Sequence, residues 1–307
     1  MFTVGASTID RDFANYVALG DKKHLMIGSL DPKKTKGKIL VCLLDEIDGL
    51  VYAEEEALSK GIIGLILANN KQRGNDIIAF AHLLPTTNIN YTDGEYVYSY
   101  IRATTNPKAC MSSAKTEVGV KPAPLIASLS SRGPNLIQPS ILKPDVIAPG
   151  VDISGTSISS PHVAAIAALL KILYPDWTPA AIKSAIMTTA TTMEENMPLL
   201  DQSKQEATSF TYRAGHMEPE LAADPGLVYD LTIDDYLNCL CAHHDFNYPS
   251  IVVPNLGKHL VEVSRTVTNV GSPGIYWVYV KESYGVSVLV KPKYLELTKL
   301  VKRRHLR

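Results

Sequence analysis

The fold of this chain is decided by the stretch Ser154-Gly155-Thr156-Ser157-Ile158-Ser159-Ser160-Pro161-His162, which continues into an apolar run from 163 to 170. Gly155 permits a tight turn. Pro161 suits the first position of a helix, because its missing N–H would be unpaired there anyway. The apolar run predicts a helix that is buried on every side.

Ser157 then lies just ahead of this helix, beside unpaired backbone N–H groups and the positive end of the helix dipole. A serine nucleophile gains most there, because those N–H groups stabilise the oxyanion that forms when it attacks a carbonyl.

Two interpretations of Ser157 follow from these residues. Serine is a common helix cap, so a purely structural role for Ser157 and Ser159 is one of them. The longer string favours catalysis, because Gly-Thr-Ser-Ile-Ser-Ser-Pro-His-Val closely resembles the nucleophile motif Gly-Thr-Ser-Met-Ser-x-Pro-His-Val of subtilisin-like serine proteases, the subtilases. The resemblance implies that Ser157 is the nucleophile. The Gly-x-Ser-x-Gly elbow of α/β-hydrolases does not fit, since Ser159 stands where the last glycine would be.

His162 is not predicted to be the catalytic base. It follows Ser157 by five residues, and five residues turn a helix by about 140°. We expect it to pack or to form a hydrogen bond locally. In the resembling family this histidine is likewise part of the helix and not of the triad.

The other residues that a subtilase needs are not found in the sequence. A serine protease requires a base that reaches the nucleophile and an acid that orients the base. In subtilases the base belongs to a His-Gly-Thr-His string and the acid to an Asp-Thr-Gly or Asp-Ser-Gly turn. Neither string occurs in the 307 residues, and the oxyanion asparagine has no match. Asp145 has a different context, Lys-Pro-Asp-Val-Ile-Ala-Pro-Gly, and we interpret it as structural. Ser157 is the only catalytic residue that the resemblance carries over.

The composition is that of a globular protein, with 46% hydrophobic and 20% charged residues. The net charge of −1 gives no reason to expect nucleic acid or an anionic membrane as a partner. No apolar run is long enough to span a bilayer. Four cysteines, at Cys42, Cys110, Cys239 and Cys241, match neither a zinc signature nor a dense disulfide framework. We therefore predict no metal and no cofactor.

The resemblance to plant subtilases covers nearly the whole chain and divides it into four parts. It implies an α/β fold: a partial subtilisin-like parallel-sheet domain, interrupted by a protease-associated domain and followed by a partial β-sandwich (fibronectin-III-like). The parts are a fragment of the catalytic domain at 1–18, the protease-associated domain at 19–117, the C-terminal part of the catalytic domain at 118–242 and a truncated fibronectin-III-like domain at 243–307.

Local patterns give further predictions for residues 19–117. Strands are expected at 38–43 and 62–68, with a helix at 52–60 between them that Gly61 terminates. Glu54, Glu55 and Glu56 lie in that helix, and we expect a solvated face there rather than a metal site, because consecutive residues fan around a helix.

Two positions in the part at 118–242 also carry predictions. Thr178 is expected to cap a second helix, with Pro179 at its first position. Arg213 stands where the resembling family usually has glycine, so we expect its bulky charged side chain to strain the packing.

Two functions remain open from the sequence. The resemblance implies a serine endopeptidase that hydrolyses peptide bonds through an acyl-enzyme on Ser157, with a protein or peptide as substrate. Without the triad Asp and His and the oxyanion Asn, the chain is expected to be inactive as it stands. The alternative is a non-catalytic protein-interaction module or degenerate pseudoprotease. The joints after Val151 and Cys241 are shorter than the family pattern, which indicates a truncated copy or an incomplete gene model.

The resemblance also implies a secreted, extracellular plant protein of the apoplast, although the first residues do not form a secretory signal. In that setting, Asn90-Tyr91-Thr92 is a sequon for an N-glycan on Asn90. No oligomeric state is predicted.

Overall fold

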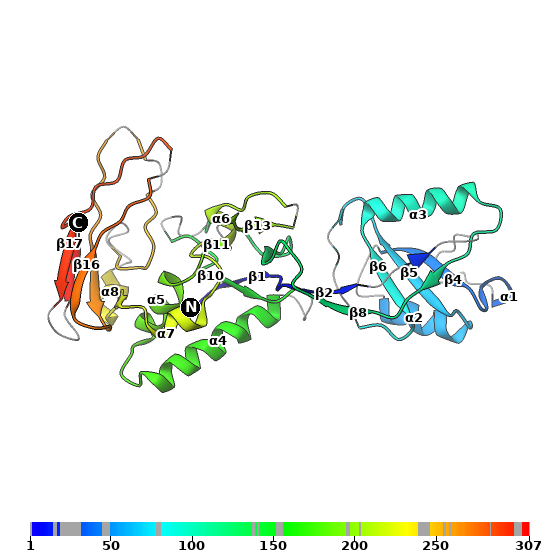
Figure 1. Ribbon diagram of the computed structural model, residues 1–307, viewed down its shortest axis with the longest axis horizontal. Coiled ribbons are helices and arrows are strands. Elements are labelled where there is room, and N and C mark those ends of the chain that lie inside the picture. Colours follow the sequence, from blue (N-terminus) through cyan, green and yellow to red (C-terminus); the bar gives the residue numbers. More distant parts are fainter. Residues whose placement is uncertain are drawn as a thin grey trace.

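The computed structural model describes residues 2–14, 17–18, 32–44, 50–75, 77, 81–136, 139, 141–151, 156–194, 197–202, 204–238, 246–253, 256–257, 259–282, 284–297 and 303–306. Three parts follow one another along the long axis in Figure 1: an inserted lobe around β4–β6, a central body around β1 and β10, and a C-terminal β-region with β16 and β17. Parallel strands occur in both the lobe and the body, in agreement with the α/β fold that the sequence predicts.

The central body is organised by a four-stranded sheet in the order β10-β1-β9-β13. Val4 pairs in parallel with Val146, so the first residues of the chain complete a sheet whose other strands follow the inserted lobe in sequence. The strands of this sheet are β1 (Val4–Ser7), β9 (Leu125–Ile126), β10 (Val146–Pro149) and β13 (Leu200–Asp201).

Helices pack on this sheet and form the main core with it. Val146 and Ala148 of β10 meet Val163 and Leu170 of α4 and Ile186 of α5 in one buried cluster. The helices of the body are α4 (Thr156–Leu173), α5 (Pro179–Thr188), α6 (Ser209–Tyr212) and α7 (Pro219–Ala223), and the short strands β11 (Met193–Glu194) and β12 (Met197–Pro198) form a separate pair. Helix α8 (Ile233–Asn238) follows the body.

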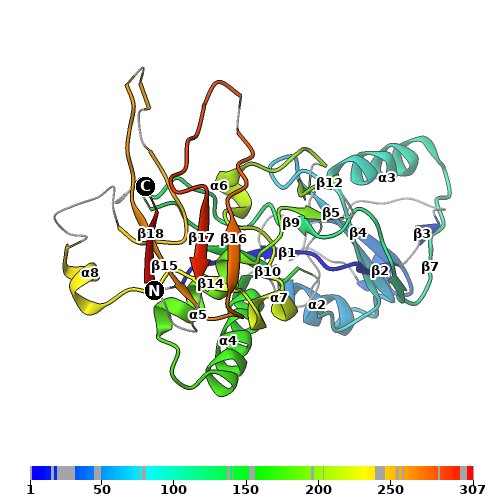
Figure 2. The same ribbon diagram turned by 60° about the vertical axis from the view of Figure 1, so that its left-hand side comes forward.

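Helix α4 differs from the prediction in two ways. It begins at Thr156, so Pro161 lies inside the helix and not at its first position. The prediction of burial on every side is also wrong, because only one face packs on the sheet. Leu169 is 55% exposed and Ile172 is 74% exposed on the other side. Figures 1 and 2 both show α4 running along the outside of the central body.

Helix α5 agrees with the prediction. Thr178 is the N-cap, its side chain accepts a hydrogen bond from the Ala181 N–H, and Pro179 is the first helical residue. The cap satisfies one of the N–H groups that have no partner inside the helix, and the proline removes another.

The inserted lobe is a three-stranded parallel sheet in the order β4-β5-β6, with a helix on each face. Alternate residues of the strands point to opposite faces. Leu40 and Leu67 therefore pack with Ala57 of α2, whereas Val41 and Ile66 pack with residues of α3. The elements of the lobe are α1 (Pro32–Thr35), β4 (Ile39–Leu44), α2 (Leu50–Ser59), β5 (Gly64–Asn69), β6 (Thr86–Ile89) and α3 (Tyr91–Ala103).

These bounds confirm both predicted strands and the helix between them. Gly61 has a φ of +75°, which glycine adopts without penalty, and it follows the end of α2 as predicted. Two antiparallel strand pairs lead to and from the lobe, β2 (Arg11–Ala14) with β8 (Lys115–Val118) and β3 (Val17–Ala18) with β7 (Cys110–Met111).

The expectation that Glu54 lies on a solvated face is wrong. Its side chain is 2% exposed. Oε2 accepts a hydrogen bond from the Leu83 N–H at 2.8 Å, and Oε1 accepts one from Nδ1 of His82 at 2.5 Å. Glu55 is exposed. The residues do fan around the helix, but the segment at 82–83 covers one of them.

The C-terminal β-region consists of two small sheets packed on each other. Val267 of one sheet and Leu295 and Leu297 of the other form its buried core, with Tyr276 against them. The first sheet has the order β14-β15-β18 and the second pairs β16 with β17; the bounds are β14 (Leu227–Val228), β15 (Arg265–Asn269), β16 (Gly274–Trp277), β17 (Tyr294–Leu297) and β18 (Arg303–Leu306). None of the described helices has both the length and the apolar character of a membrane span.

Replacement of Gly215 by alanine tests the packing beneath β10. Gly215 has a φ of +127°, and an added Cβ would lie 2.1 Å from the carbonyl oxygen of Thr191. We expect Gly215→Ala to lower the free energy of unfolding by about 3 kcal/mol or more. Gly119 has a φ of +74° with nothing near its Cβ position, so Gly119→Ala should cost only about 1–2 kcal/mol. Urea denaturation of both variants measures the difference, and equal losses would contradict the clash.

Candidate functional site

Ser157 lies in the first turn of α4 with its side chain exposed. Two neighbours tie this end of the helix to the end of β10. The Ser159 hydroxyl donates to the Ala148 carbonyl at 3.0 Å, and Nδ1 of His162 donates to the Pro149 carbonyl at 2.9 Å. His162 therefore forms a local hydrogen bond, as predicted, and Ser159 is a buried anchor.

The helix start offers Ser157 part of what a nucleophile needs. Backbone N–H groups of a first helical turn have no partners within the helix and carry the positive end of its dipole. Pro161 has no N–H, so the Ser157 carbonyl lacks the donor that would normally come from four residues later. The unpaired N–H groups of this turn can stabilise negative charge, whereas the unpaired carbonyl cannot, and the turn contains no side chain that could take up the Ser157 proton.

No imidazole hydrogen-bonds the Ser157 hydroxyl within the part of the chain that the structure describes. His82 binds Glu54 in the inserted lobe, and His162 binds Pro149. The side chain of His216 is largely buried, and His259 lies in the C-terminal β-region. His24, His243, His244 and the side chain of His305 lie outside the described residues. Nor do the described residues contain a group of His, Cys, Asp and Glu side chains that could hold a metal ion.

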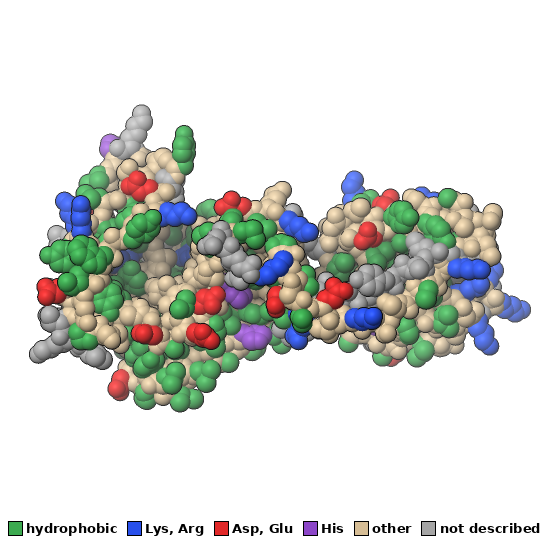
Figure 3. All heavy atoms as spheres, viewed as in Figure 1, with side chains coloured by type: hydrophobic (Ala, Val, Ile, Leu, Met, Phe, Trp, Pro, Cys, Tyr) green, Lys and Arg blue, Asp and Glu red, His purple; other side chains and the backbone are tan. Residues whose placement is uncertain are grey.

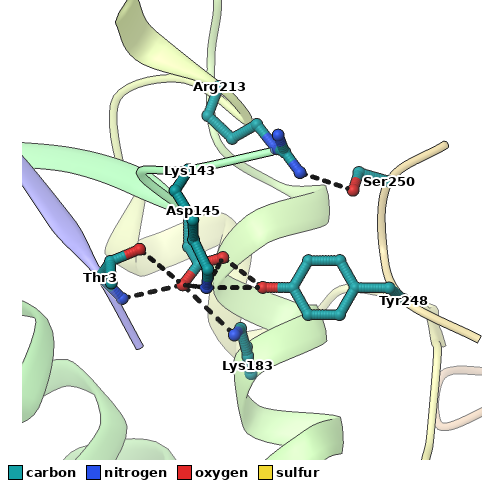
Figure 4. Close-up of polar contacts among 7 residues, drawn as sticks. All are labelled: Thr3, Lys143, Asp145, Lys183, Arg213, Tyr248 and Ser250. Carbon is teal, nitrogen blue, oxygen red and sulfur yellow. Dashed lines mark hydrogen bonds and ion pairs between the residues drawn. The ribbon is translucent and has the colours of Figure 1, made fainter. Parts of the chain in front are cut away.

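Asp145 is structural, as interpreted from its sequence context. Its carboxylate is fully buried just before β10. Oδ2 accepts hydrogen bonds from the Thr3 N–H at 2.8 Å and from the Thr3 hydroxyl at 3.1 Å. Lys143 lies at 2.7 Å and Lys183 at 3.2 Å from the same oxygen, and the Tyr248 hydroxyl donates to Oδ1 (Figure 4).

The charges in this cluster shift one another's pKa values. Burial by itself would raise the pKa of Asp145, but Lys183 and Lys143 outweigh it and hold that pKa below its ordinary value. Burial lowers the pKa of Lys183 to about 8, against the opposing attraction of Asp145. The Lys183 ammonium also lies 4.6 Å from the ring centre of Tyr248 and 5.1 Å from that of Phe2, and such cation–π contacts favour its charged form.

This cluster was not predicted from the sequence, although the sequence contains one signal for it. Lys183 follows the apolar residues Ala181 and Ile182 in α5. A lysine inside an apolar helix face needs a buried partner, since an unpaired buried charge is very unfavourable. Asp145 could have been proposed as that partner, but Thr3 and Tyr248 are brought to it only by the fold.

Arg213 is strained in its backbone, whereas the prediction was of strained side-chain packing. Its φ of 61° lies in the left-handed region that favours glycine. The side chain is 7% exposed, and Nη2 donates to the Ser250 hydroxyl at 2.9 Å. Burial lowers the pKa of the Arg213 guanidinium to about 10.

The chain matches the Subtilase family over residues 3–215 and a Fibronectin type-III domain over residues 245–307. It belongs to the subtilase family. Subtilisin-like protease SBT5.3 of Arabidopsis thaliana is 40% identical over 385 residues, covering 97% of this chain and 50% of that protein. Subtilisin-like protease SBT5.4 of the same plant is also 40% identical, covering 97% and 49%. The chain therefore spans about half the length of the curated relatives it matches.

The chain is also similar to a soybean relative and, more weakly, to a solved bacterial structure. Subtilisin-like protease Glyma18g48580 of Glycine max is 37% identical, covering 99% of this chain and 51% of its own length. A solved psychrophilic subtilisin-like protease from an Antarctic Pseudoalteromonas has 11% identity and a TM-score of 0.24, covering 72% of this chain and 44% of its own. That score adds nothing to the family assignment.

Neutralising Asp145 tests the buried cluster. Asp145→Asn leaves Lys143 and Lys183 without their counter-charge, and we expect it to lower the free energy of unfolding at pH 7 by about 3 kcal/mol. Because the pKa of Asp145 is lowered in the folded chain, this stabilisation is fully present above its ordinary pKa of about 4 and is lost as the pH falls from there through the lowered folded pKa. Chemical denaturation at several pH values measures it. The exposed Asp176→Asn is the control, and an equal effect of both changes would refute the role of Asp145.

His216 gives a second prediction for pH dependence. Its Nε2 atom is buried without a hydrogen-bond partner, and burial lowers its pKa to about 4. The unfolded chain takes up this proton near pH 6.5, whereas the folded chain resists it until about pH 4. Stability should therefore fall by at most about 3 kcal/mol from this group as the pH drops through that window. In His216→Gln the fall in Tm over this window should be smaller, and identical profiles would contradict the burial of a neutral imidazole.

Proposed function

We propose that this chain is the nucleophile-bearing part of a subtilisin-like serine endopeptidase, with Ser157 as the nucleophile, and that it does not hydrolyse peptides as it stands. Family membership and the motif around Ser157 support the first half of the proposal. One observation carries the second half: within the described residues, the exposed Ser157 hydroxyl has no imidazole bonded to it.

The surface around Ser157 indicates where a base would have to come from. Each residue of a helix is turned by about 100° from the one before it. By this period Ala164, Ala168 and Ile172 lie on the same face of α4 as Ser157, and all three are exposed. Figure 3 shows hydrophobic side chains at the surface where Figure 1 places α4. A group that covered this apolar face would also meet the Ser157 hydroxyl.

The lengths of the aligned relatives support such a covering segment. The alignment with SBT5.3 runs over 385 residues and includes 97% of a chain of only 307 residues. SBT5.3 therefore has residues within the aligned span that this chain lacks. About half of the length of SBT5.3 lies outside the aligned span as well. We propose that a triad acid and base belong to segments of this kind.

The chemistry explains why the chain alone is expected to be inactive. The Ser157 oxygen would attack the peptide carbonyl carbon while its proton passes to a base; the tetrahedral intermediate would then release the amine and leave an acyl-enzyme, which water hydrolyses. A neutral hydroxyl is a weak nucleophile without that base. Binding and oxyanion stabilisation alone leave only residual catalysis in such enzymes.

A second candidate function is a non-catalytic protein-interaction module. The observation that favours it is that the inserted lobe and the C-terminal β-region each have a buried core that does not involve Ser157. In that case Ser157 is a remnant, as in a degenerate pseudoprotease.

The finer assignments rest on the same family resemblance. We propose the division into 1–18, 19–117, 118–242 and 243–307, with a protein or peptide as substrate and an extracellular location. The sheet pairing of β1 with β10 supports joining the first part to the third, and β14 from the third part pairs with β15 of the fourth.

An N-glycan on Asn90 is part of this extracellular proposal. Asn90 is the N-cap of α3, and its Nδ2, the atom that a glycan would occupy, donates to Asp93 Oδ2 at 2.8 Å. Oδ1 accepts from the Asp93 N–H, so the cap itself does not require Nδ2.

A fluorophosphonate probe tests the proposal. We expect no labelling of Ser157 in the purified chain at neutral pH, because no base removes its proton. Added imidazole, at tens to hundreds of millimolar, should restore slow labelling by acting as an external base. Mass spectrometry of the peptide around Ser157 measures the labelling.

Two variants make this experiment decisive. Ser157→Ala should abolish the imidazole-dependent label, whereas Ser160→Ala, at an exposed neighbour on the same helix, should retain it. Labelling without imidazole that Ser157→Ala removes would refute inactivity. No labelling at Ser157 even with imidazole would refute its role as a nucleophile and favour the interaction module.

A further inference from the structure

Two buried arginines converge on Ser250 at the junction between the central body and the C-terminal β-region. Nη2 of Arg213 donates to the Ser250 hydroxyl at 2.9 Å, and Nη2 of Arg265 donates to the Ser250 carbonyl at 3.2 Å. Both side chains are 7% exposed. Figure 4 shows the Arg213 guanidinium extending toward Ser250, on the side of the cluster away from Thr3.

The guanidinium of Arg213 is not neutralised within the described residues. Its Nε and Nη1 atoms are buried and have no hydrogen-bond partner. No described carboxylate forms an ion pair with it, and the nearby Asp145 is already held by Lys143 and Lys183. A buried cation with unused donors is very unfavourable unless an ion or water satisfies it.

The backbone makes this arrangement less favourable still. Arg213 holds a φ of 61°, which glycine would adopt without strain. A bound anion would offset the buried charge by supplying acceptors to the unused N–H groups, although it would leave the backbone strain unchanged.

We propose that Arg213, together with Arg265, binds a small tetrahedral oxyanion of the phosphate or sulfate class beside Ser250. A planar guanidinium presents several N–H donors in a fixed geometry that matches the oxygens of such anions. The second guanidinium approaches the same residue and adds positive charge. The site uses no part of the Ser157 region and does not depend on whether the chain is a protease.

Occupancy of this site would couple two parts of the molecule. Arg213 belongs to the central body, whereas Ser250 lies between β14 and β15 of the C-terminal β-region and follows Tyr248, which binds Asp145. An anion held between them binds the folded chain and not the unfolded one, so it stabilises the junction by mass action.

Isothermal titration calorimetry with sodium phosphate, and separately with sodium sulfate, tests the proposal at an ionic strength kept constant with sodium chloride. The full chain should bind one anion and show a Tm that rises with anion concentration. Arg213→Gly removes the guanidinium and also relieves the backbone strain, because glycine adopts a φ of 61° without penalty. This variant should therefore fold with an equal or higher basal Tm. Its Kd for the anion should rise at least about tenfold, the change expected when one strong charged contact is lost.

Arg132→Ala is the matched control. Arg132 is exposed in the loop before Gly133 and contacts Asp201 at 3.4 Å, so its loss should leave the Kd unchanged. Three outcomes would overturn the proposal: no binding by the full chain, equal binding by Arg213→Gly, or an equal loss in both variants. The last would indicate general attraction of anions to a positive surface.

Discussion

The buried carboxylate of Asp145 is the constraint on which the central body depends. A fully buried charge must be paired and hydrogen-bonded, because its desolvation is otherwise too costly. Asp145 finds its partners on four segments that are far apart in sequence: Thr3 before β1, Lys143 beside it, Lys183 on α5, and Tyr248 near the C-terminal β-region. Satisfying this one group therefore brings the start, the middle and the last quarter of the chain together.

The same constraint supports the helix that carries Ser157. Asp145 immediately precedes β10, and β10 lies in the sheet beside β1. The end of β10 in turn accepts hydrogen bonds from Ser159 and His162 of α4. The start of α4 is thus anchored through two side chains, while Ser157, which precedes both of them, is exposed. The proposed nucleophile therefore stands on an anchored helix start with its side chain exposed to solvent, so its chemistry depends on which groups cover it.

Sequence patterns predicted the elements of the fold that depend on interactions between residues close together in the chain. The strands of the inserted lobe and the Thr178 cap agree with the structure, because each depends on side-chain hydrophobicity or backbone preference within a few residues. The errors have a different origin. Glu54 is buried because His82 and Leu83 cover it from a segment 28 and 29 residues away, and no local pattern contains that contact.

The sequence alone determined the family, the identity of the candidate nucleophile and the order of the subtilase and fibronectin type-III regions, because these lie in continuous strings of residues. Only the tertiary structure decided that one apolar face of α4 is exposed, that Asp145 joins four segments, and that Arg213 is a buried cation with unused donors. The reason is physical. The hydrophobicity and charge of a side chain determine whether it requires burial or a hydrogen-bonding partner. Whether such a partner is present depends on distant segments that only folding brings into contact.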